Sequence, residues 1–285
     1  MQESLYNQAN IIADTIAGEI PILVKPAQNI ASQLIGFHAK KQAGSSDEFF
    51  QFRPYSNGES VANIDWRQSA KSDKAFVKQK EQQSPRRFQI FALQNPRINW
   101  QFSPESPNKR NIANIIALAL GFAMIDIGES VLVAGQQKTT KSKNTIAQSL
   151  GAIIGELPQE FNQGVSLIFH DGLCDLSLFE AAFKRANSSG NKIILGIIKD
   201  ENEANFNFKG RIEFQNIDSD EKILIENCDE IRNQYIANYQ RHFAQLDELA
   251  KNNNVLINNI YCGKDILNQI MPIWQNALLL DEVKL

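Results

Sequence analysis

Short apolar segments alternate with longer segments of helical character over most of the chain. Five apolar segments are typical of buried strands: RRFQIFAL (86–93), ESVLVAG (129–135), GVSLIFHDG (164–172), NKIILGIIKD (191–200) and VLINNIY (255–261). Segments of helical length lie between and after them, at 112–128, 143–157, 176–190, 226–253 and near 263–280. Apolar strands that alternate with helices of about 10–15 residues form βαβ units. The pattern therefore predicts an α/β fold with a mostly parallel sheet and helices on both faces.

The first 85 residues follow a different pattern. Short helices are expected at 3–17 and 25–37, and strands at 49–60 and 74–80. The regular alternation of strands and helices begins only after this stretch. We therefore expect residues 86–285 to form the main domain, and residues 1–85 to be an N-terminal extension of helices and strands that packs on it.

The composition is that of an ordinary globular protein. The chain has 285 residues, of which 43% are hydrophobic and 21% charged, and its formal net charge is −3. Its apolar runs are interrupted by polar residues, as at Asn114 and Asp126, so no stretch of about 18 apolar residues could span a membrane. The first residues lack the positive region and apolar core of a secretory signal. We expect a cytoplasmic protein without membrane insertion.

The distribution of charge does not indicate a nucleic-acid partner. Residues 36–90 carry ten Lys or Arg against six Asp or Glu, a local excess of four positive charges. Nucleic-acid-binding domains usually show a dense basic stripe and a pI above about 9. We therefore expect an ordinary surface of mixed charge and no nucleic-acid binding.

The cysteines are few and isolated. Cys174, Cys228 and Cys262 are the three cysteines of the chain, and none has a cysteine neighbour at the spacing of a metal-binding motif. This usage argues against a disulfide framework and against a structural zinc site, and it fits a reducing compartment.

Motifs of common enzyme classes are absent from the sequence. There is no P-loop, no dinucleotide-binding glycine motif, no nucleophile elbow and no metalloprotease helix motif, so no cofactor is expected. The pair His170-Asp171 follows a predicted buried strand, at the sheet edge where ligands bind in open α/β folds. It could be the acid/base pair of a hydrolase, or a loop pair with Asp171 or Asp175 capping the next helix. We favour the structural reading because no nucleophile partner is evident.

One block, at residues 36–81, combines arginine, carboxylate and aromatic residues at high density. Arg53, Tyr55, Asp65, Trp66 and Arg67 lie within it. Arginine–carboxylate bonds and aromatic stacking could make the block a structural clasp or a recognition surface. From chemistry alone we favour the clasp.

The same block resembles the hallmark stretch of the MoxR-associated bacterial family DUF58. In that family an Arg-x-Tyr-x-x-Gly-[Asp/Glu] element leads into Ile-Asp-Trp-x-x-Ser-Ala. The residues that match are Arg53, Tyr55, Gly58, Glu59, Ile64, Asp65, Trp66, Ser69 and Ala70. An upstream element is matched by Gly36, His38, Lys40, Lys41 and Gly44, and a downstream element by Phe206, Phe208, Gly210, Arg211 and Phe214. In the downstream element Glu201 and Asn207 replace prolines of the family pattern.

The resemblance implies a von Willebrand factor A-like (Rossmann-like) main domain. It also implies a non-enzymatic role as a chaperone-like adaptor beside a MoxR-type AAA+ ATPase, in the assembly or activation of client protein complexes. The residues that we assign to this interaction are Arg53, Tyr55, Gly58, Glu59, Asp65, Trp66, Arg67 and Ser69. The hydrolase that would use His170 and Asp171 is the alternative, and a cation-dependent adhesion module is a third possibility that the motifs disfavour.

A departure from the fold family concerns its metal site. Many von Willebrand factor A domains hold a divalent cation through Asp-x-Ser-x-Ser after the first strand, in a metal-ion-dependent adhesion site (MIDAS). Here the equivalent stretch is FALQNPRINW, with Asp171 at the later acidic position. Three registers are open, Leu93-x-Asn95-x-Arg97, Gln94-x-Pro96-x-Ile98 and Asn95-x-Arg97-x-Asn99, and two of them place Arg97 in the site. A guanidinium would repel a cation, and one carboxylate rarely holds Mg²⁺ unaided. We predict that this MIDAS is degenerate and binds no metal.

Overall fold

The computed structural model describes residues 25–35, 49–56, 60, 64–71, 74–80, 87–215 and 221–280. By backbone contacts the chain divides into two compact units, and each is described by itself below. The main unit comprises Met1–Ile35 and Arg86–Leu285, and the second unit comprises Gly36–Pro85. The expected helix at 3–17 lies outside the described residues, whereas residues 25–35 are helical.

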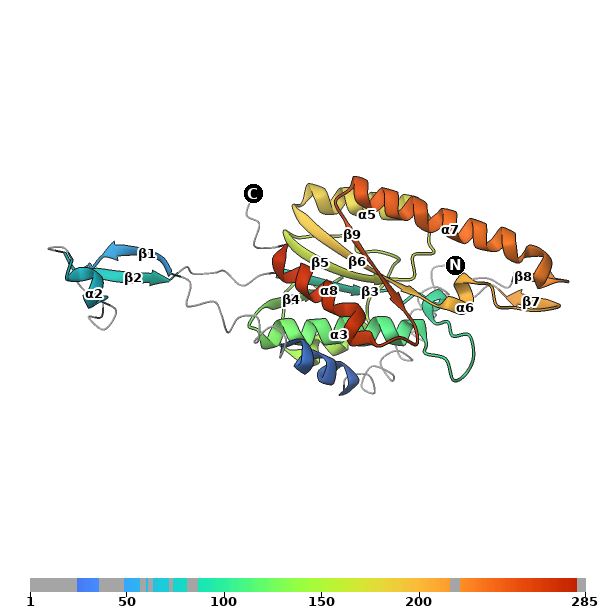
Figure 1. Ribbon diagram of the computed structural model, residues 1–285, viewed down its shortest axis with the longest axis horizontal. Coiled ribbons are helices and arrows are strands. Elements are labelled where there is room, and N and C mark those ends of the chain that lie inside the picture. Colours follow the sequence, from blue (N-terminus) through green and yellow to red (C-terminus); the bar gives the residue numbers. More distant parts are fainter. Residues whose placement is uncertain are drawn as a thin grey trace. The chain divides into compact units, whose positions relative to one another are not determined.

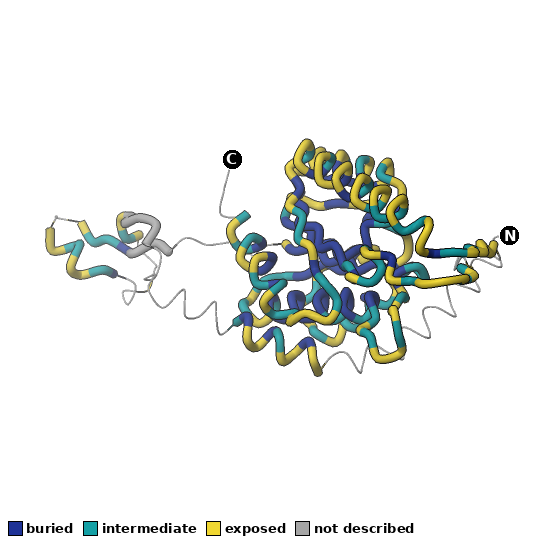
Figure 2. The backbone as a smooth tube through the Cα atoms, turned by 45° about the vertical axis from the view of Figure 1, so that its right-hand side comes forward, coloured by how far each residue is buried: buried dark blue, intermediate teal, exposed yellow. Residues whose placement is uncertain are grey.

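A five-stranded parallel sheet forms the centre of the main unit, as predicted (Figure 1). Its strands, in spatial order, are β4 (Ser130–Val133), β3 (Arg87–Ala92), β5 (Gly164–His170), β6 (Asn191–Lys199) and β9 (Leu256–Tyr261). The inner strands β3, β5 and β6 run through the buried interior (Figure 2). Because both faces of these strands are covered, their sequences are continuously apolar rather than alternating.

Helices cover both faces of the sheet (Figure 1). On one face α3 (Lys109–Asp126) packs against the inner strands, α8 (Ile266–Leu279) packs beside it, and α4 (Lys143–Leu150) contacts α3 and β4. On the other face lie α5 (Leu176–Ser188) and α7 (Cys228–Asn252), which contact each other. None of the described helices is long and apolar enough to cross a membrane.

The helix at residues 25–35 belongs to the main unit, although a long stretch of chain separates it from β3. It buries Ala27, Ala31 and Leu34 in the same core as the sheet and its helices. Their spacing of four and three residues places these side chains on one face of the helix. The expected N-terminal extension is thus divided between the two units.

Two predicted helix boundaries in the main unit are wrong. Helix α3 begins at Lys109 rather than near 112, because Asn108 caps it by accepting from the backbone N–H groups of Arg110 and Asn111. Helix α4 ends at Leu150 instead of continuing to 157. The chain leaves the helix there and Gly155 takes a positive φ of 100°, which interrupts the helical path.

The sequence patterns also missed three short elements of the main unit. The 3-10 turn η2 (Pro96–Ile98) follows β3, and the short helix α6 (Glu201–Ala204) follows β6. A two-stranded antiparallel hairpin, β7 (Ile212–Gln215) and β8 (Lys222–Ile225), lies between α6 and α7. These elements contain four residues or fewer, too short to show a periodic pattern.

The second unit contains a small antiparallel pair, as predicted. Strand β1 (Phe49–Pro54) pairs with β2 (Phe76–Lys80), with Arg53 opposite Val77. Between them lies the one-turn helix α2 (Trp66–Ser69). Ile64 forms an isolated bridge with Val77, and both residues are buried.

The strand order of the main sheet places a topological switch point at the carboxyl ends of β3 and β5, and we call this edge the crevice. After β3 the chain forms β4 on one side of it, and then returns to form β5 on the other side. The connections that leave β3 and β5 therefore diverge, and open α/β sheets bind ligands at such a point, outside the carboxyl ends of the strands. The residues at the carboxyl ends of β3 and β5 are therefore candidates for a functional site.

Candidate functional site

Arg97 joins the two strand ends at the crevice. It lies in η2, directly after β3, and Asp171 directly follows β5. Arg97 Nε is 3.1 Å from Asp171 Oδ2, and Arg97 Nη2 is 2.6 Å from Glu156 Oε2. One guanidinium therefore bridges two carboxylates that come from different connections of the fold.

Asn95 holds this arrangement from the side of β3. Its Oδ1 accepts from the backbone N–H of Arg97 at 2.9 Å, which caps η2, and its Nδ2 donates to Glu156 Oε1 at 2.6 Å. Asn99 does not join the cluster, because it is exposed and its Oδ1 accepts from Asn108 Nδ2. Of the four residues predicted at the degenerate metal site, the structure thus brings together Asn95, Arg97 and Asp171.

The carboxylate of Asp171 is almost fully buried and remains ionised. Its Oδ1 accepts from the backbone N–H of Leu173 at 3.0 Å. Burial by itself would raise the pKa of Asp171. The opposing hydrogen bond and charge of His170, together with the charges of Lys109 and Arg97, hold that pKa well below its usual range.

His170 is the last residue of β5 and is fully buried. Its Nδ1 lies 3.1 Å from Asp171 Oδ1 and 2.8 Å from the backbone N of Gly172. Burial by itself would lower the pKa of the imidazole. Acceptors on Asp171, Cys174 and Glu156 outweigh that effect and raise the pKa to about 10. The surroundings of this ring therefore favour positive charge.

A second buried ion pair lies further along the same edge of the sheet. Lys109, at the start of α3, is 1% exposed, and its Nζ is 2.8 Å from Glu203 Oε2. The same ammonium group lies 5.9 Å from the ring centre of Trp100. Burial raises the pKa of Glu203, and the charge of Lys109 opposes that rise. The crevice edge thus carries two cations, each already paired with carboxylates.

The residues at the degenerate metal site do not fit Mg²⁺. A hard cation needs several oxygen ligands that are free to point at it. Here the Asn95 oxygen caps η2, and the carboxylates of Asp171 and Glu156 both face the guanidinium of Arg97. The positively charged guanidinium of Arg97 thus occupies the carboxylate oxygens that Mg²⁺ would need as ligands.

The pair His170-Asp171 lies at the carboxyl end of β5 and is engaged in contacts within the fold. Asp175, rather than Asp171, caps α5 by accepting from the backbone N–H of Ser177 at 2.8 Å. Asp171 instead pairs with Arg97 and His170. Both members of the pair are buried, so a substrate has no direct approach to the imidazole. The arrangement offers no specific support for the hydrolase alternative.

In the second unit, Asp65 and Ser69 hold α2 on β2. The side chain of Asp65 caps α2 by accepting from the backbone N–H of Gln68 at 2.9 Å. Ser69 Oγ donates to the backbone oxygen of Asp65 and accepts from the backbone N–H of Phe76, each at 2.8 Å. These contacts form a clasp within the hallmark block.

The other hallmark residues have different positions. Trp66 is 67% exposed on α2, and Arg67 beside it is also exposed. Tyr55 is half-buried, and its backbone N–H donates to the oxygen of Ala75. Arg53 lies in β1, and the predicted residues Gly58 and Glu59 lie outside the described residues.

Sequence reasoning missed Glu156, Cys174 and Lys109 at the crevice. Glu156 was placed at the end of a helix, whereas it lies in the connection between α4 and β5. In the sequence Cys174 is an isolated cysteine, and Lys109 belongs to no motif. The three residues are far apart in the sequence, and the strand order brings them together, so no local spacing could have revealed them.

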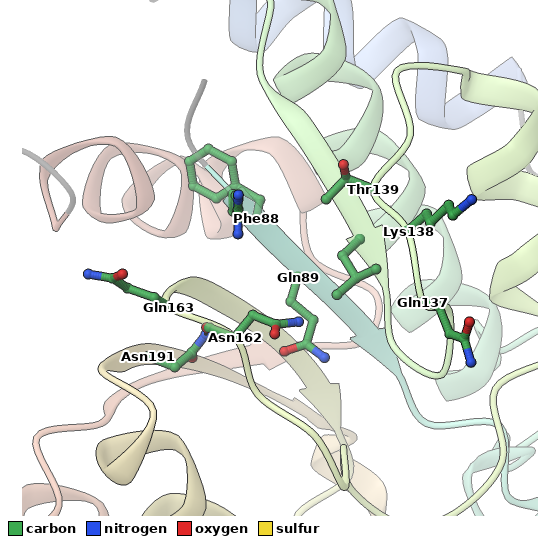
Figure 3. A pocket seen from close by; sticks show the side chains of 10 residues that line it. Phe88, Gln89, Gln137, Lys138, Thr139, Asn162, Gln163 and Asn191 are labelled. Atoms are coloured by element: carbon green, nitrogen blue, oxygen red, sulfur yellow. Dashed lines mark hydrogen bonds between the residues drawn. The ribbon is translucent and has the colours of Figure 1, made fainter. Parts of the chain in front are cut away.

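A polar pocket of about 450 Å³ lies at the opposite edge of the sheet, at the amino ends of the strands (Figure 3). Its amide side chains are used to hold connections of the fold. Gln89 donates to the backbone oxygen of Glu160 and accepts from Ser166, and Asn191 donates to the backbone oxygen of Asn162. Gln89 and Asn191 therefore hold connections of the fold.

Comparison with known proteins identifies one family. Residues 51–160 match the family described as "Protein of unknown function DUF58". No curated protein and no solved structure matches the chain. The matched range contains the clasp residues Asp65 and Ser69, the exposed Trp66, and Asn95, Arg97 and Glu156 of the crevice. The match covers residues 51–160 and supports a relation of this part of the chain to DUF58, a family of unknown function.

Proposed function

We propose that this chain is a non-enzymatic adaptor with a von Willebrand factor A-like main domain. It would act beside a MoxR-type AAA+ ATPase in the assembly or activation of client protein complexes. The resemblance of the hallmark block to DUF58 proteins and the family match over residues 51–160 support this proposal. The parallel sheet with helices on both faces is compatible with the proposed domain type.

The observation that carries the proposal is the exposure of Trp66. Tryptophan is usually well buried, and where it is exposed it is enriched in the centres of protein interfaces. Asp65 and Ser69 on either side of it bond within the second unit. The hydrogen bonds of Asp65 and Ser69 thus fix a helix that presents a 67% exposed indole. We therefore propose that the block serves both as a structural clasp and as a recognition surface.

The arrangement of the crevice supports an interaction role rather than catalysis. Arg97 neutralises Glu156 and Asp171, and His170 is fully buried. A general acid or base must reach the substrate proton within hydrogen-bond distance. The buried imidazole would have to move out of the core to do so. We therefore propose that these residues stabilise the fold of the main unit.

Co-purification with the MoxR-type ATPase of the same organism tests the proposal. The full chain should retain the ATPase, and the double variant Arg53→Ala, Trp66→Ala should lose it while remaining folded. Ile154→Ala is the matched control, because Ile154 is an 81% exposed apolar residue far from the hallmark block in sequence. Retention by the double variant would remove the hallmark block as the contact surface.

Two further outcomes would contradict the proposal as a whole. If the unmodified chain does not retain the ATPase under conditions in which both proteins are folded, the partnership is wrong. If the purified chain turns over an esterase, phosphatase or nuclease substrate, and His170→Gln abolishes that turnover, the protein is an enzyme and the hydrolase alternative replaces the adaptor.

A further inference from the structure

Three different metal-binding side chains converge beside Arg97. Glu156 comes from the connection after α4, His170 from the end of β5, and Cys174 from the connection after β5. Their carboxylate oxygen, imidazole nitrogen and thiol sulfur all lie within 4.8 Å of one another. His170 and Cys174 are buried and Glu156 is partly exposed, so the cluster opens on the side of Glu156.

The imidazole of His170 is oriented as a metal-ligating histidine would be. Its Nε2 points into the cluster, 3.7 Å from Glu156 Oε2, and is buried without a hydrogen-bond partner among the described residues. Its Nδ1 accepts from the backbone N–H of Gly172 at 2.8 Å and lies 3.1 Å from Asp171 Oδ1. A histidine that ligates a metal through one nitrogen usually donates from the other to a carboxylate. Zinc binding at Nε2 therefore requires Nδ1 to carry the proton and to donate to Asp171 instead of accepting from Gly172.

We propose that Glu156, His170 and Cys174 form a zinc site, with Asp171 orienting His170. This inference does not rest on the adaptor function. Zinc binds thiolate, imidazole and carboxylate groups together, most often with tetrahedral geometry. Zinc–ligand bonds of about 2.0–2.3 Å place tetrahedral donors roughly 3.3–3.8 Å apart. The 3.7 Å between His170 Nε2 and Glu156 Oε2 is slightly longer than the roughly 3.3–3.5 Å expected for a nitrogen and an oxygen donor, so a small movement would complete the pair.

The donor set distinguishes this site from the degenerate MIDAS. Magnesium prefers oxygen ligands, whereas a thiolate and an imidazole favour zinc. The ligand oxygen of Glu156 also pairs with Arg97, but the guanidinium keeps Asp171 as a second partner when zinc binds. Three protein donors leave the fourth position of a tetrahedral zinc ion for water or another donor.

The charges of the occupied site would balance. Cys174 loses its proton when it binds zinc, since the thiolate is the metal ligand. The ion and Arg97 then carry three positive charges, and Glu156, Asp171 and the Cys174 thiolate carry three negative ones. A buried ionic cluster without net charge avoids the penalty of an unpaired buried ion.

Sequence spacing gave no indication of this site, and indeed argued against zinc. Structural zinc motifs are recognised by pairs of closely spaced ligands. Here 14 positions separate Glu156 from His170, and four separate His170 from Cys174. The ligands meet because the connection from α4 and the end of β5 lie at the same edge of the sheet.

Titration of the full chain with zinc and cobalt tests the proposal. After purification with a chelator, the chain should bind one Zn²⁺ per molecule, and thermal unfolding should shift upward by several degrees at saturating Zn²⁺. Co²⁺ in the same site should produce a thiolate-to-cobalt charge-transfer absorption. Cys174→Ser should lose this absorption and weaken zinc binding by at least about 100-fold, since even second-sphere changes cost about 10–100-fold.

Cys262→Ser is the matched control, because Cys262 is a free cysteine outside the cluster. It should retain the stoichiometry, the affinity and the cobalt absorption. If Cys174→Ser does not fold, Glu156→Gln replaces it, since Glu156 is 26% exposed and lies in a connection. Wild-type chain that binds no Zn²⁺ below about 10 µM would overturn the proposal. Binding that both Cys174→Ser and Glu156→Gln leave unchanged would do so as well.

Discussion

The guanidinium of Arg97 lies 3.1 Å from the carboxylate of Asp171 and ties the end of β3 to the end of β5. The two residues are 74 positions apart in the sequence, and the strand order makes them neighbours. Asp171 is 1% exposed and Arg97 is 26% exposed, so the pair is partly shielded from water. The stability of this edge of the sheet and its affinity for cations should therefore depend on Arg97.

Removal of Arg97 should destabilise the protein. Arg97→Ala leaves the buried Asp171 without its nearest cation, and breaking a buried pair by removing one partner costs about 3–5 kcal/mol. Because Arg97 is partly exposed, we expect a loss of about 2–4 kcal/mol in the free energy of unfolding, measured by urea denaturation. Lys184→Ala, which breaks an exposed pair with Glu180, should cost less than about 1 kcal/mol. Equal effects of the two substitutions would contradict the structural importance of Arg97.

Magnesium should not bind at Asn95, Arg97 and Asp171, the residues that the sequence predicts to form a degenerate MIDAS. Asn95 and Asp171 direct their oxygens at backbone N–H groups and at Arg97, so no free set of oxygen ligands is presented to a hard cation. Calorimetric titration with Mg²⁺ should show no micromolar binding. Micromolar binding that disappears in Asp171→Ala would contradict this prediction and restore a cation site. The same titration with Zn²⁺ provides the contrast between hard and borderline ions.

Removal of Lys109 should make stability depend on pH. Burial already raises the pKa of Glu203, while Lys109 opposes the rise and Asp171 and Asp200 add to it. In Lys109→Met the pKa of Glu203 rises further, so the folded state binds a proton more tightly than the unfolded state. Stability then falls as the pH rises from the unfolded pKa, about 4.5, to the raised folded value. Denaturation at pH 5 and pH 8 should show a larger destabilisation at pH 8.

A second variant separates this effect from lost packing. In Lys109→Met, Glu203→Gln no carboxyl group titrates at position 203, so most of the pH dependence should disappear while the loss of packing remains. A double variant that keeps the full difference between pH 5 and pH 8 would show that another group is responsible.

Loss of the Asp65 cap should loosen the hallmark clasp. Asp65→Ala removes the acceptor for the backbone N–H of Gln68, and the loss of an N-cap typically costs about 1 kcal/mol. Hydrogen exchange at the amides of α2 should therefore accelerate by about fivefold. Asp65→Asn should behave nearly as the wild type, because asparagine caps helices as well as aspartate. Fast exchange in both variants would show that the charge, rather than the cap, is needed.

Much of the main fold could be predicted because its elements carry a repeating pattern. Strand β5 and helix α7, for example, lie within the ranges that the pattern of their apolar residues predicts. Helix α4 was extended too far, because apolar residues such as Ile153 continue beyond its last turn. Those residues enter the core from an irregular connection, which hydrophobicity alone does not distinguish from a helix.

Of the site residues, only those that lie next to the end of a predicted strand could be predicted. Asp171 and Arg97 flank predicted strands, so the rule for open α/β sheets places them at one edge. Glu156 and Cys174 belong to connections, and their positions depend on how those connections cross the sheet. Interactions of this kind are determined by tertiary packing, which a single sequence does not reveal.

The helix at residues 25–35 makes the second unit an insertion within the main unit, rather than an appendage before it. Ala27, Ala31 and Leu34 anchor the chain in the core before it leaves to form residues 36–85. Excision of residues 36–85, with a short linker from Ile35 to Arg86, should therefore leave the core complete. Truncation of the first 85 residues would instead strip a helix from the core and expose the apolar surface beneath it.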